Sequence, residues 1–446
     1  MFASSRPPLR VLVIGAGLGG LCLAHGLRQA GVAHVDVFER ARVQHDPLQS
    51  YRIHINPIGS RALHACLPTS VWQAIVAHAA RPPRGIAFVT HTLQPLTAFD
   101  EPPSSATDAR SLPISRAGLR TLLLDGLEDV VHFDKRCVGY DLSAAGQVVA
   151  RFADGTTASG DVLVGADGAA SVVRRQYLPQ ARVQPTGVAG IAGKLRLDDA
   201  AAPGLPLNQA AATWPSVDHA AAAHGRPAGW LEQMTMVVPP RGLGLFVAPF
   251  RRAAADVPWR DDVDLPDHLF WALIGRPAQL GLAAAERSED GPALQRQAAA
   301  AVADWHPAIR QLIAASDPST LLSVPLHTSA PVPAWPSSRV TLLGDAIHTM
   351  TPLQGLGGNT ALQDAARLVA ALGAVQRGDV PLLEAIGAYE AALRHDGFAA
   401  VRQSLQVTEQ LASTNALARL AFTSVLRLAD HVGPLHRRLF RRPAAA

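Results

Sequence analysis

The chain has 446 residues, 48% hydrophobic and 17% charged, which is typical of a globular enzyme and excludes a disordered chain. Its formal net charge of +4 comes almost entirely from arginine, because lysine occurs only at Lys135 and Lys194. The densest basic run, at residues 437–442, is most simply a solvated helix end, although it could contact acidic lipid, nucleic acid or a partner. No aromatic residues alternate with basic ones, so we expect no nucleic-acid partner. Three widely spaced cysteines and the lack of a long apolar run predict a cytoplasmic protein with no metal site and no transmembrane segment.

The first predicted elements form a βαβ unit. An apolar run at residues 10–14 predicts a buried strand, and residues 23–30 carry apolar side chains at helical spacing until Gly31 ends the helix. Residues 35–38 form a second short apolar run. The order strand, helix, strand is typical of a parallel sheet, so we expect an α/β fold of the Rossmann type.

The turn between the first strand and the helix has the spacing G-x-G-x-x-G, with Gly15, Gly17 and Gly20 at the glycine positions. Such glycines permit a tight turn and let the helix N-terminus face a pyrophosphate. Glu39 ends the second strand about 20 positions further on, where a carboxylate can bind a ribose hydroxyl. The pattern predicts a dinucleotide site that includes Glu39 and the adjacent Arg40.

Two segments further along have strand character. Residues 51–55 alternate in polarity and place Arg52 and His54 on one face. Residues 137–164 form short alternating runs separated by glycine turns, which predicts an antiparallel meander that leads into a buried strand. Residues 186–320 carry no dinucleotide signature, so we assign them to a second lobe of mixed strands and helices.

The nucleotide-binding pattern returns near residue 340. Residues 340–343 predict another buried strand, followed by a glycine-rich loop and a helix with an apolar face at residues 362–372. Asp345 ends the strand, where a carboxylate can accept hydrogen bonds from sugar hydroxyls. After Gly378 helical spacing continues, which predicts a helical C-terminal tail. The expected domains are a dinucleotide-binding domain at 1–80, 105–185 and 321–373, a substrate-binding α+β lobe at 81–104 and 186–320, and a C-terminal helical region at 374–446.

Two motifs identify the dinucleotide by resemblance. Asp167-Gly168, with Ser171 and Arg174 after it, and Gly344-Asp345, with His348 after it, look like the DG and GD motifs of one flavoprotein family. The family is that of the class A, single-component flavin-dependent monooxygenases, of the para-hydroxybenzoate hydroxylase type. The resemblance covers about residues 10–185 and 320–372 and implies non-covalent FAD. It implies cofactor-binding roles for these further residues: Arg116, Asp167, Gly168, Asp345, Gly355, Gly357, Gly358 and Asn359.

The resemblance also implies the chemistry. NADH or NADPH, bound transiently, reduces FAD, and the reduced flavin forms a C4a-hydroperoxide with O2 that hydroxylates or epoxidises a small hydrophobic, aromatic or polycyclic substrate. Glycines of the loop are expected to bring the backbone close to the flavin, and a helix starting near Asn359 to direct its N–H groups at the ring. Because the family often places an arginine of this region against the flavin, Arg52 is a candidate there. His54 and His348 are candidate proton donors, although each is more simply a hydrogen-bonded histidine.

Several alternatives stay open at this point. Asp167 and Asp345 also fit plain turns, and Arg116 fits a surface helix. Among related flavoproteins, a halogenase is disfavoured because no W-x-W-x-I-P segment occurs, and a geranylgeranyl-type reductase or a non-catalytic binding protein shares the expected scaffold. Four aromatic residues of the second lobe could line a pocket or lie in the core: Trp214, Trp230, Phe246 and Phe250.

Overall fold

A five-stranded parallel sheet forms one half of the molecule in the computed structural model, with strand order β17-β11-β1-β2-β7. The structure describes residues 8–42, 51–100, 109–143, 146–197, 229–240, 242–253, 257–283 and 287–431. Buried aliphatic side chains fill both faces of the strands, as expected for a parallel sheet covered on two sides. The strands are β1 (Arg10–Ile14), β2 (His34–Phe38), β7 (Val131–His132), β11 (Val162–Gly165) and β17 (Val340–Leu342).

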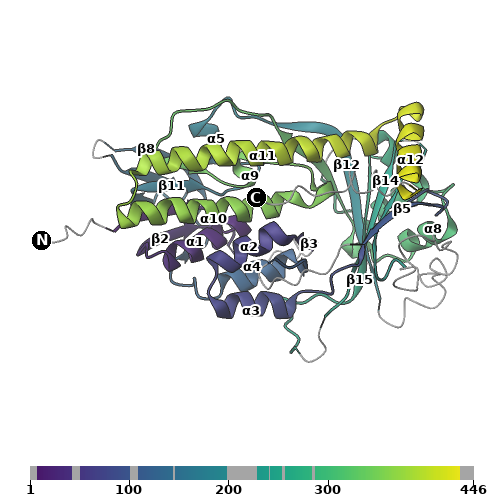
Figure 1. Cartoon of the computed structure of the whole chain (residues 1–446), viewed down its shortest axis with the longest axis horizontal. Helices are drawn as coiled ribbons and strands as arrows, with labels where there is room; N and C mark the ends of the chain where they lie inside the picture. Colours follow the sequence, from purple (N-terminus) through teal and green to yellow (C-terminus); the bar gives the residue numbers. More distant parts are fainter. Residues whose placement is uncertain are drawn as a thin grey trace, which may run out of the picture.

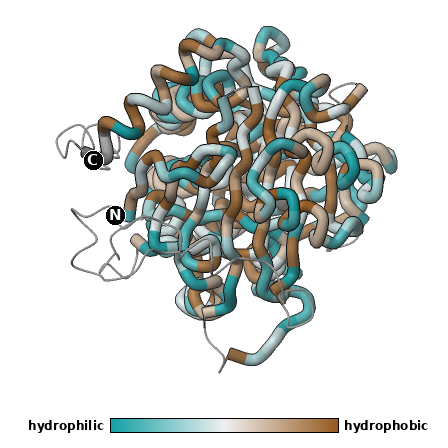
Figure 2. Tube along the Cα trace, turned by 90° about the vertical axis from the view of Figure 1, so that its right-hand side faces the viewer, coloured by the Kyte–Doolittle hydropathy of each residue, from teal (hydrophilic) through white to brown (hydrophobic). Residues whose placement is uncertain are grey.

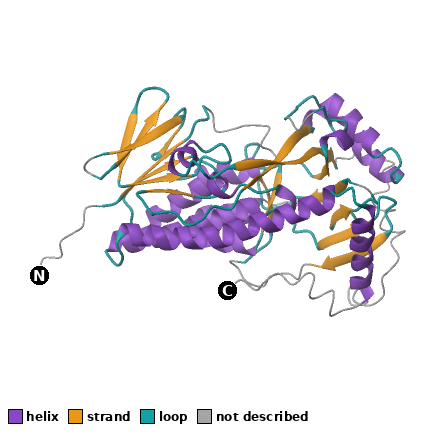
Figure 3. Ribbon diagram, turned by 90° about the horizontal axis from the view of Figure 1, so that it is seen from above, coloured by secondary structure: helices purple, strands orange, loops and turns teal. Residues whose placement is uncertain are grey.

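Helices and a small antiparallel sheet enclose the parallel sheet (Figure 1, Figure 3). The predicted meander is present as a three-stranded sheet that contacts β1 and β11. Its strands are β8 (Cys137–Leu142), β9 (Val148–Phe152) and β10 (Thr157–Gly160). The helices that pack here are α1 (Leu18–Gln29), α2 (Pro57–Cys66), α3 (Thr69–His78), α4 (Arg116–Leu124), α5 (Val172–Tyr177), α9 (Asp345–His348) and α10 (Leu356–Arg377).

A seven-stranded sheet forms the other half, with order β16-β12-β15-β14-β13-β4-β5. Helices α7 (Gly291–Ala301) and α8 (Pro307–Ala314) cover its outer face, where Trp271 and Leu273 are fully buried. The sheet includes residues 322–329, which the sequence analysis grouped with the dinucleotide-binding half, because this strand pairs with β12. The strands are β4 (Gly85–Val89), β5 (Pro95–Asp100), β12 (Val183–Arg196), β13 (Met234–Val237), β14 (Gly244–Phe250), β15 (His268–Gly275) and β16 (Leu322–Ser329).

Helix α11 (Leu382–Ala412) joins the two halves. It lies along α10 and continues to contacts with the seven-stranded sheet, as Figure 1 shows. The Tyr389 hydroxyl donates to the Leu342 carbonyl at 2.8 Å, which fixes the helix to β17. Helix α12 (Ala416–His431) follows and contacts β5. Figure 2 shows hydrophobic segments concentrated inside the molecule and hydrophilic ones at its periphery, as burial of apolar area requires.

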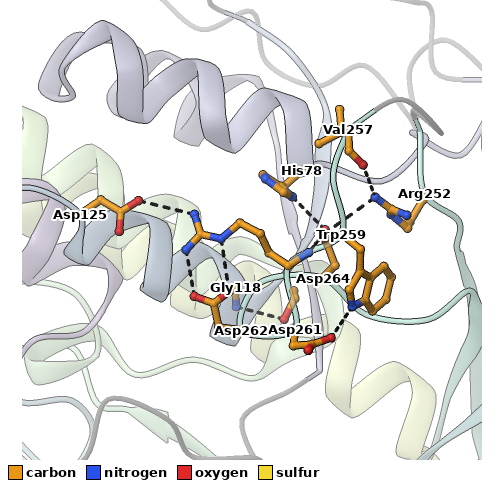
Figure 4. A network of polar contacts seen from close by, with 11 residues as sticks. His78, Gly118, Asp125, Arg252, Val257, Trp259, Asp261, Asp262 and Asp264 are labelled. Carbon is orange, nitrogen blue, oxygen red and sulfur yellow. Dashed lines mark hydrogen bonds and ion pairs between the residues drawn. The ribbon is translucent and has the colours of Figure 1, made fainter.

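A network of polar contacts closes the junction between the halves (Figure 4). The buried Asp264 carboxylate accepts from the Arg260 N–H at 2.9 Å and lies 3.0 Å from Nδ1 of His78, which ends α3. Gly118 of α4 packs so tightly here that an added Cβ would clash with the Val263 carbonyl oxygen. Segment 257–264 is therefore attached to the helices of the first half by both packing and hydrogen bonds.

Across the described part of the chain, no helix combines the length and apolar character that a membrane span requires.

Candidate functional site

The three glycines of the first turn have different roles. Gly15 has a φ of +112°, and an added Cβ there would clash with the Ala166 carbonyl. A Cβ on Gly20 would clash with the Gly15 carbonyl, so this glycine permits α1 to pack on the turn. By contrast, a Cβ on Gly17 would meet no atom within 4 Å. Gly17 thus leaves open space at the N-terminus of α1, where a pyrophosphate binds in dinucleotide folds.

Glu39 lies beside this turn at the carboxyl end of β2. One carboxylate oxygen accepts from the Ala16 N–H at 2.9 Å, and the other accepts from the Ala41 N–H at 2.9 Å. Arg120 donates to the Ala16 carbonyl at 2.9 Å and lies 3.9 Å from Glu39. Arg120 was not among the residues predicted for the site, although it lies one helical turn after Arg116. Arg40, the next residue after Glu39, is exposed to solvent.

The DG motif has an observed structural role. Asp167 Oδ2 accepts from the Val172 N–H at 2.7 Å and so caps α5. Its other oxygen, Oδ1, is buried and has no hydrogen-bond partner among the described residues. Gly168 has a φ of +76°, and a Cβ there would meet nothing within 4 Å. The motif therefore combines a helix cap with an unpaired acceptor beside open space.

Arg174 connects the DG motif to the GD motif. This buried guanidinium donates to the carbonyls of Ala346 and Ala169, each at 2.9 Å. Its contacts bring the start of α9 next to α5, although 172 positions separate Arg174 from Ala346 along the chain. The two motifs therefore belong to one site.

Asp345 is the first residue of α9, and its side chain is accessible to solvent while protein surrounds it on most sides. Desolvation by these surroundings raises the pKa of the Asp345 carboxyl above its ordinary value, whereas the charges of His348 and Arg116 oppose the rise. Arg116, at the start of α4, therefore lies near enough to Asp345 for its charge to act on the carboxyl. The Asp345 carboxylate is an accessible acceptor at the end of β17.

His348 cannot act on a substrate, because its side chain is fully buried. Its Nε2 lies 2.6 Å from the Asp364 carboxylate, and the same carboxylate oxygen accepts from the Gly344 N–H at 3.0 Å. Burial opposes charge on the imidazole, but Asp364 outweighs it and raises the pKa of His348. His348 is therefore the ordinary hydrogen-bonded histidine that was expected as the simpler alternative to a proton donor, and no sequence signal pointed to Asp364.

The glycine-rich segment differs from the expected loop. Helix α10 begins at Leu356, so Gly357 and Gly358 lie in its first turn, and only Gly355, just before it, has a positive φ, of +62°. A Cβ on Gly358 or on Gly355 would meet nothing within 4 Å. The earlier helix start still leaves the first N–H groups of α10 without intrahelical partners, facing a glycine-lined space.

Asn359 is not available to a cofactor through its side chain. Its Oδ1 accepts from the Asn56 N–H at 2.9 Å, and its Nδ2 donates to the carbonyls of His54 and Gly355 at 2.9 and 2.7 Å. Protein groups therefore satisfy the side-chain amide, and the contact of Asn359 with the cofactor stays a prediction that concerns the backbone N–H groups of the helix start. Asn359 instead fixes the two-stranded sheet of β3 (Arg52–Ile55) and β6 (Leu112–Ser115) against the start of α10.

The inner face of the seven-stranded sheet lies opposite the start of α10. Half-buried Phe246 and Phe270 contact each other edge to face at 6.5 Å on this face. Leu353, two residues before Gly355, packs with the apolar clusters that contain Phe246 and Ala272. Trp230 and Phe250 are 2% and 3% exposed and belong to the core, while Trp214 lies outside the described residues.

These residues fit an FAD molecule. Gly17, Gly168, Gly355 and Gly358 each adjoin open space, Asp167 Oδ1 lacks a partner among the described residues, and Asp345 is an accessible carboxylate. These positions lie at the N-terminus of α1, beside α5 and α9, and at the start of α10.

Comparisons with known proteins agree with this geometry. Residues 275–403 match the model of an FAD binding domain, and residues 13–44 match that of an NAD(P)-binding Rossmann-like domain. The FAD-dependent urate hydroxylase of Klebsiella pneumoniae is 31% identical over 401 residues, which are 86% of this chain and 85% of that protein. The chain belongs to the family of FAD-dependent monooxygenases, and FAD is its cofactor.

Other relatives extend beyond this chain. The dual O-methyltransferase/FAD-dependent monooxygenase elcB of Phaeosphaeria nodorum is 32% identical over 400 residues, or 82% of this chain. The chain spans only 40% of that protein's length. Among solved structures, Klebsiella pneumoniae HpxO complexed with FAD and uric acid has a TM-score of 0.73 and 27% identity, covering 94% of this chain and 93% of that one.

Proposed function

We propose that this protein is a monooxygenase that uses NADH or NADPH and O2 to hydroxylate or epoxidise a small organic molecule. The observation that carries the proposal is the placement of half-buried Phe246, Phe270 and Ala272 opposite the glycine-lined start of α10. Bound FAD would supply the redox chemistry there. The aromatic face supports an apolar substrate beside the flavin, and the uric acid bound by the related HpxO supports a small one.

The residues of the chain have supporting roles in this proposal. The glycines of the first turn and the α1 N-terminus would hold the pyrophosphate, Glu39 a ribose, and Asp345 the ribityl hydroxyls. The start of α10 would place positive potential at the edge of the ring, while the apolar sheet excludes water. The chain carries a single G-x-G-x-x-G, so we propose that the nicotinamide reductant binds transiently.

Product analysis under labelled oxygen tests this function. The purified holoenzyme is incubated with NADH or NADPH, 18O2 and a panel of small aromatic compounds, and products are analysed by mass spectrometry. We expect reductant oxidation that substrate accelerates and products that gain one labelled oxygen. Gain of a halogen or of two hydrogens would instead indicate a halogenase or a reductase, and a colourless protein would indicate a non-catalytic scaffold.

We also propose a reducing, cytoplasmic location. Cys22 and Cys66 are buried on α1 and α2, where their thiols share a hydrogen bond. Their state as free thiols supports a reducing compartment.

A further inference from the structure

Arg52 is buried, and among the described residues no acidic side chain forms an ion pair with it. The residue is 8% exposed, and its Nε and Nη2 are buried and have no hydrogen-bond partner among the described residues. Burial lowers the pKa of the guanidinium to about 10, so it remains charged at neutral pH. A buried, unpaired cation costs several kcal/mol of stability. Such a group is expected to gain an anionic partner in the functional complex.

Hydrogen bonds to neighbouring elements hold the backbone around Arg52 in place. Arg52 pairs with Ser115 across the β3–β6 ladder, and the neighbouring Tyr51 carbonyl accepts from the Arg116 N–H at 3.0 Å. Two residues on, the His54 carbonyl accepts from Asn359 at the start of α10. Arg52 therefore lies between the proposed flavin site and the seven-stranded sheet.

The facing part of the seven-stranded sheet also lacks negative charge. His268 is the first residue of β15. Burial lowers the pKa of its imidazole to about 4, and the positive charges of Lys194 and Arg52 contribute to this shift. Its Nδ1 lies 2.7 Å from the Pro266 carbonyl, while its Nε2 is buried without a partner among the described residues. Burial likewise lowers the pKa of Lys194, on β12, to about 8.

No acidic residue of these elements compensates the positive charge. Strands β3, β12, β14 and β15 contain no Asp or Glu. The adjacent Asp267 accepts from the Arg252 N–H at 2.9 Å and lies 3.8 Å from the Arg251 guanidinium. Its observed partners are therefore Arg251 and Arg252 rather than Arg52. These strands thus carry Arg52 and Lys194 with no acidic residue of their own to balance the positive charge.

We propose that Arg52 binds an anionic group of the organic substrate, and that the substrate is a carboxylic acid, an acidic phenol or an enol. This inference rests on the proposed function. The shared chemistry is recognition of a delocalised anion, which the flavin ring could also supply. The substrate is favoured because the charge of Arg52 acts on His268 of the second half, whereas the start of α10 already offers positive potential to the ring.

The test uses the FAD-loaded enzyme, Arg52→Met and Arg52→Lys, with Arg310→Met as the control. Arg310 is an exposed arginine on α8, on the outer side of the seven-stranded sheet. Benzoate, salicylate and the neutral benzamide are titrated while the flavin absorption spectrum is recorded. We expect Arg52→Met to weaken binding of the acids by about ten- to a hundredfold, as for a lost hydrogen bond to a charged group. Benzamide binding should be unchanged, Arg52→Lys should restore part of the affinity for the acids, and Arg310→Met should match the parent.

Three outcomes would overturn the proposal. Equal affinity of the parent and Arg52→Met for the acids would do so, and so would a parent that binds neither acid. The third is loss of FAD or a shifted flavin potential in Arg52→Met with acid binding retained, which would assign Arg52 to the cofactor. Failure of the proposed function is distinct, because it would appear as products without labelled oxygen whatever the behaviour of Arg52.

Discussion

At the scale of single residues, we expect the Asp345 carboxylate to destabilise the apoprotein and to contribute to FAD binding. Its surroundings raise the pKa of the carboxyl, so the folded apoprotein prefers the protonated form and loses stability as pH rises through that raised pKa. We therefore predict that Asp345→Asn makes the apoprotein at least as stable as the parent at neutral pH, measured by thermal unfolding. FAD affinity should fall by about ten- to a hundredfold in the same variant, because an amide replaces a charged acceptor.

The pH dependence of FAD affinity distinguishes a direct role of the Asp345 carboxylate from a general weakening of FAD binding. The parent should release FAD as the pH falls through the raised pKa of Asp345, whereas Asp345→Asn should show no such step. Asp379→Asn is the matched control, since Asp379 is exposed and pairs only with Arg377 in the described structure. Parent-like FAD affinity in Asp345→Asn would remove the carboxylate from the cofactor site.

At the scale of elements, the start of α10 contains two glycines with different requirements, Gly355 for its backbone conformation and Gly358 for the open space beside it. Gly355 has a positive φ, so Gly355→Val should destabilise the apoprotein by about 1–3 kcal/mol. Gly358 lies in the helix with free space at the Cβ position, so Gly358→Val should leave the apoprotein stable. The added side chain should hold the helix end away from the flavin and lower its reduction potential by about 5–40 mV. Potentiometric titration measures this, and an unchanged potential would refute the role given to the α10 terminus.

The contact between α9 and α10 depends on the buried His348 and Asp364. Asp364→Asn removes the charge that stabilises the imidazolium and leaves it buried alone, so we predict a loss of about 3–5 kcal/mol at pH 6. Since Asp364 raises the pKa of His348, the pair stabilises the fold below the unfolded histidine pKa and the effect fades as pH rises through the folded one. Denaturant unfolding of the parent and of Asp364→Asn across pH 5–9 measures how this stabilisation depends on pH. A pH-independent loss would show that His348 is neutral in the parent.

At the scale of the whole molecule, the Asp264 network couples the two halves. Asp264→Ala should leave His78 and the Arg260 N–H unpaired at a buried junction, at a cost of about 1–3 kcal/mol. We also expect the parent to unfold in one transition and Asp264→Ala in two, because each half has its own core. Asp262→Asn is the control, because its ion pair with Arg260 is partly exposed and contributes under about 1 kcal/mol. Calorimetry that shows equal behaviour in both variants would contradict the coupling role.

The sequence by itself determined the parallel sheet and the first turn. These depend on local patterns, namely apolar runs of strand length and glycines at turn spacing, so Gly15, Gly17 and Gly20 could be read without contacts. The FAD assignment came from the resemblance of the DG and GD motifs to a flavoprotein family, and the comparisons confirm it.

Only the tertiary structure decided which polar groups remain open for a ligand. Asn359 and His348 matched functional motifs. In the fold, however, the Asn359 side chain accepts from the Asn56 N–H, and the buried His348 imidazole pairs with Asp364. Arg52 carried no stronger signal than His54, but in the described part of the fold its buried Nε and Nη2 have no hydrogen-bond partner. The physical reason is that hydrogen-bond satisfaction and desolvation depend on residues brought together by folding, whereas periodicity and turn chemistry are properties of neighbouring residues.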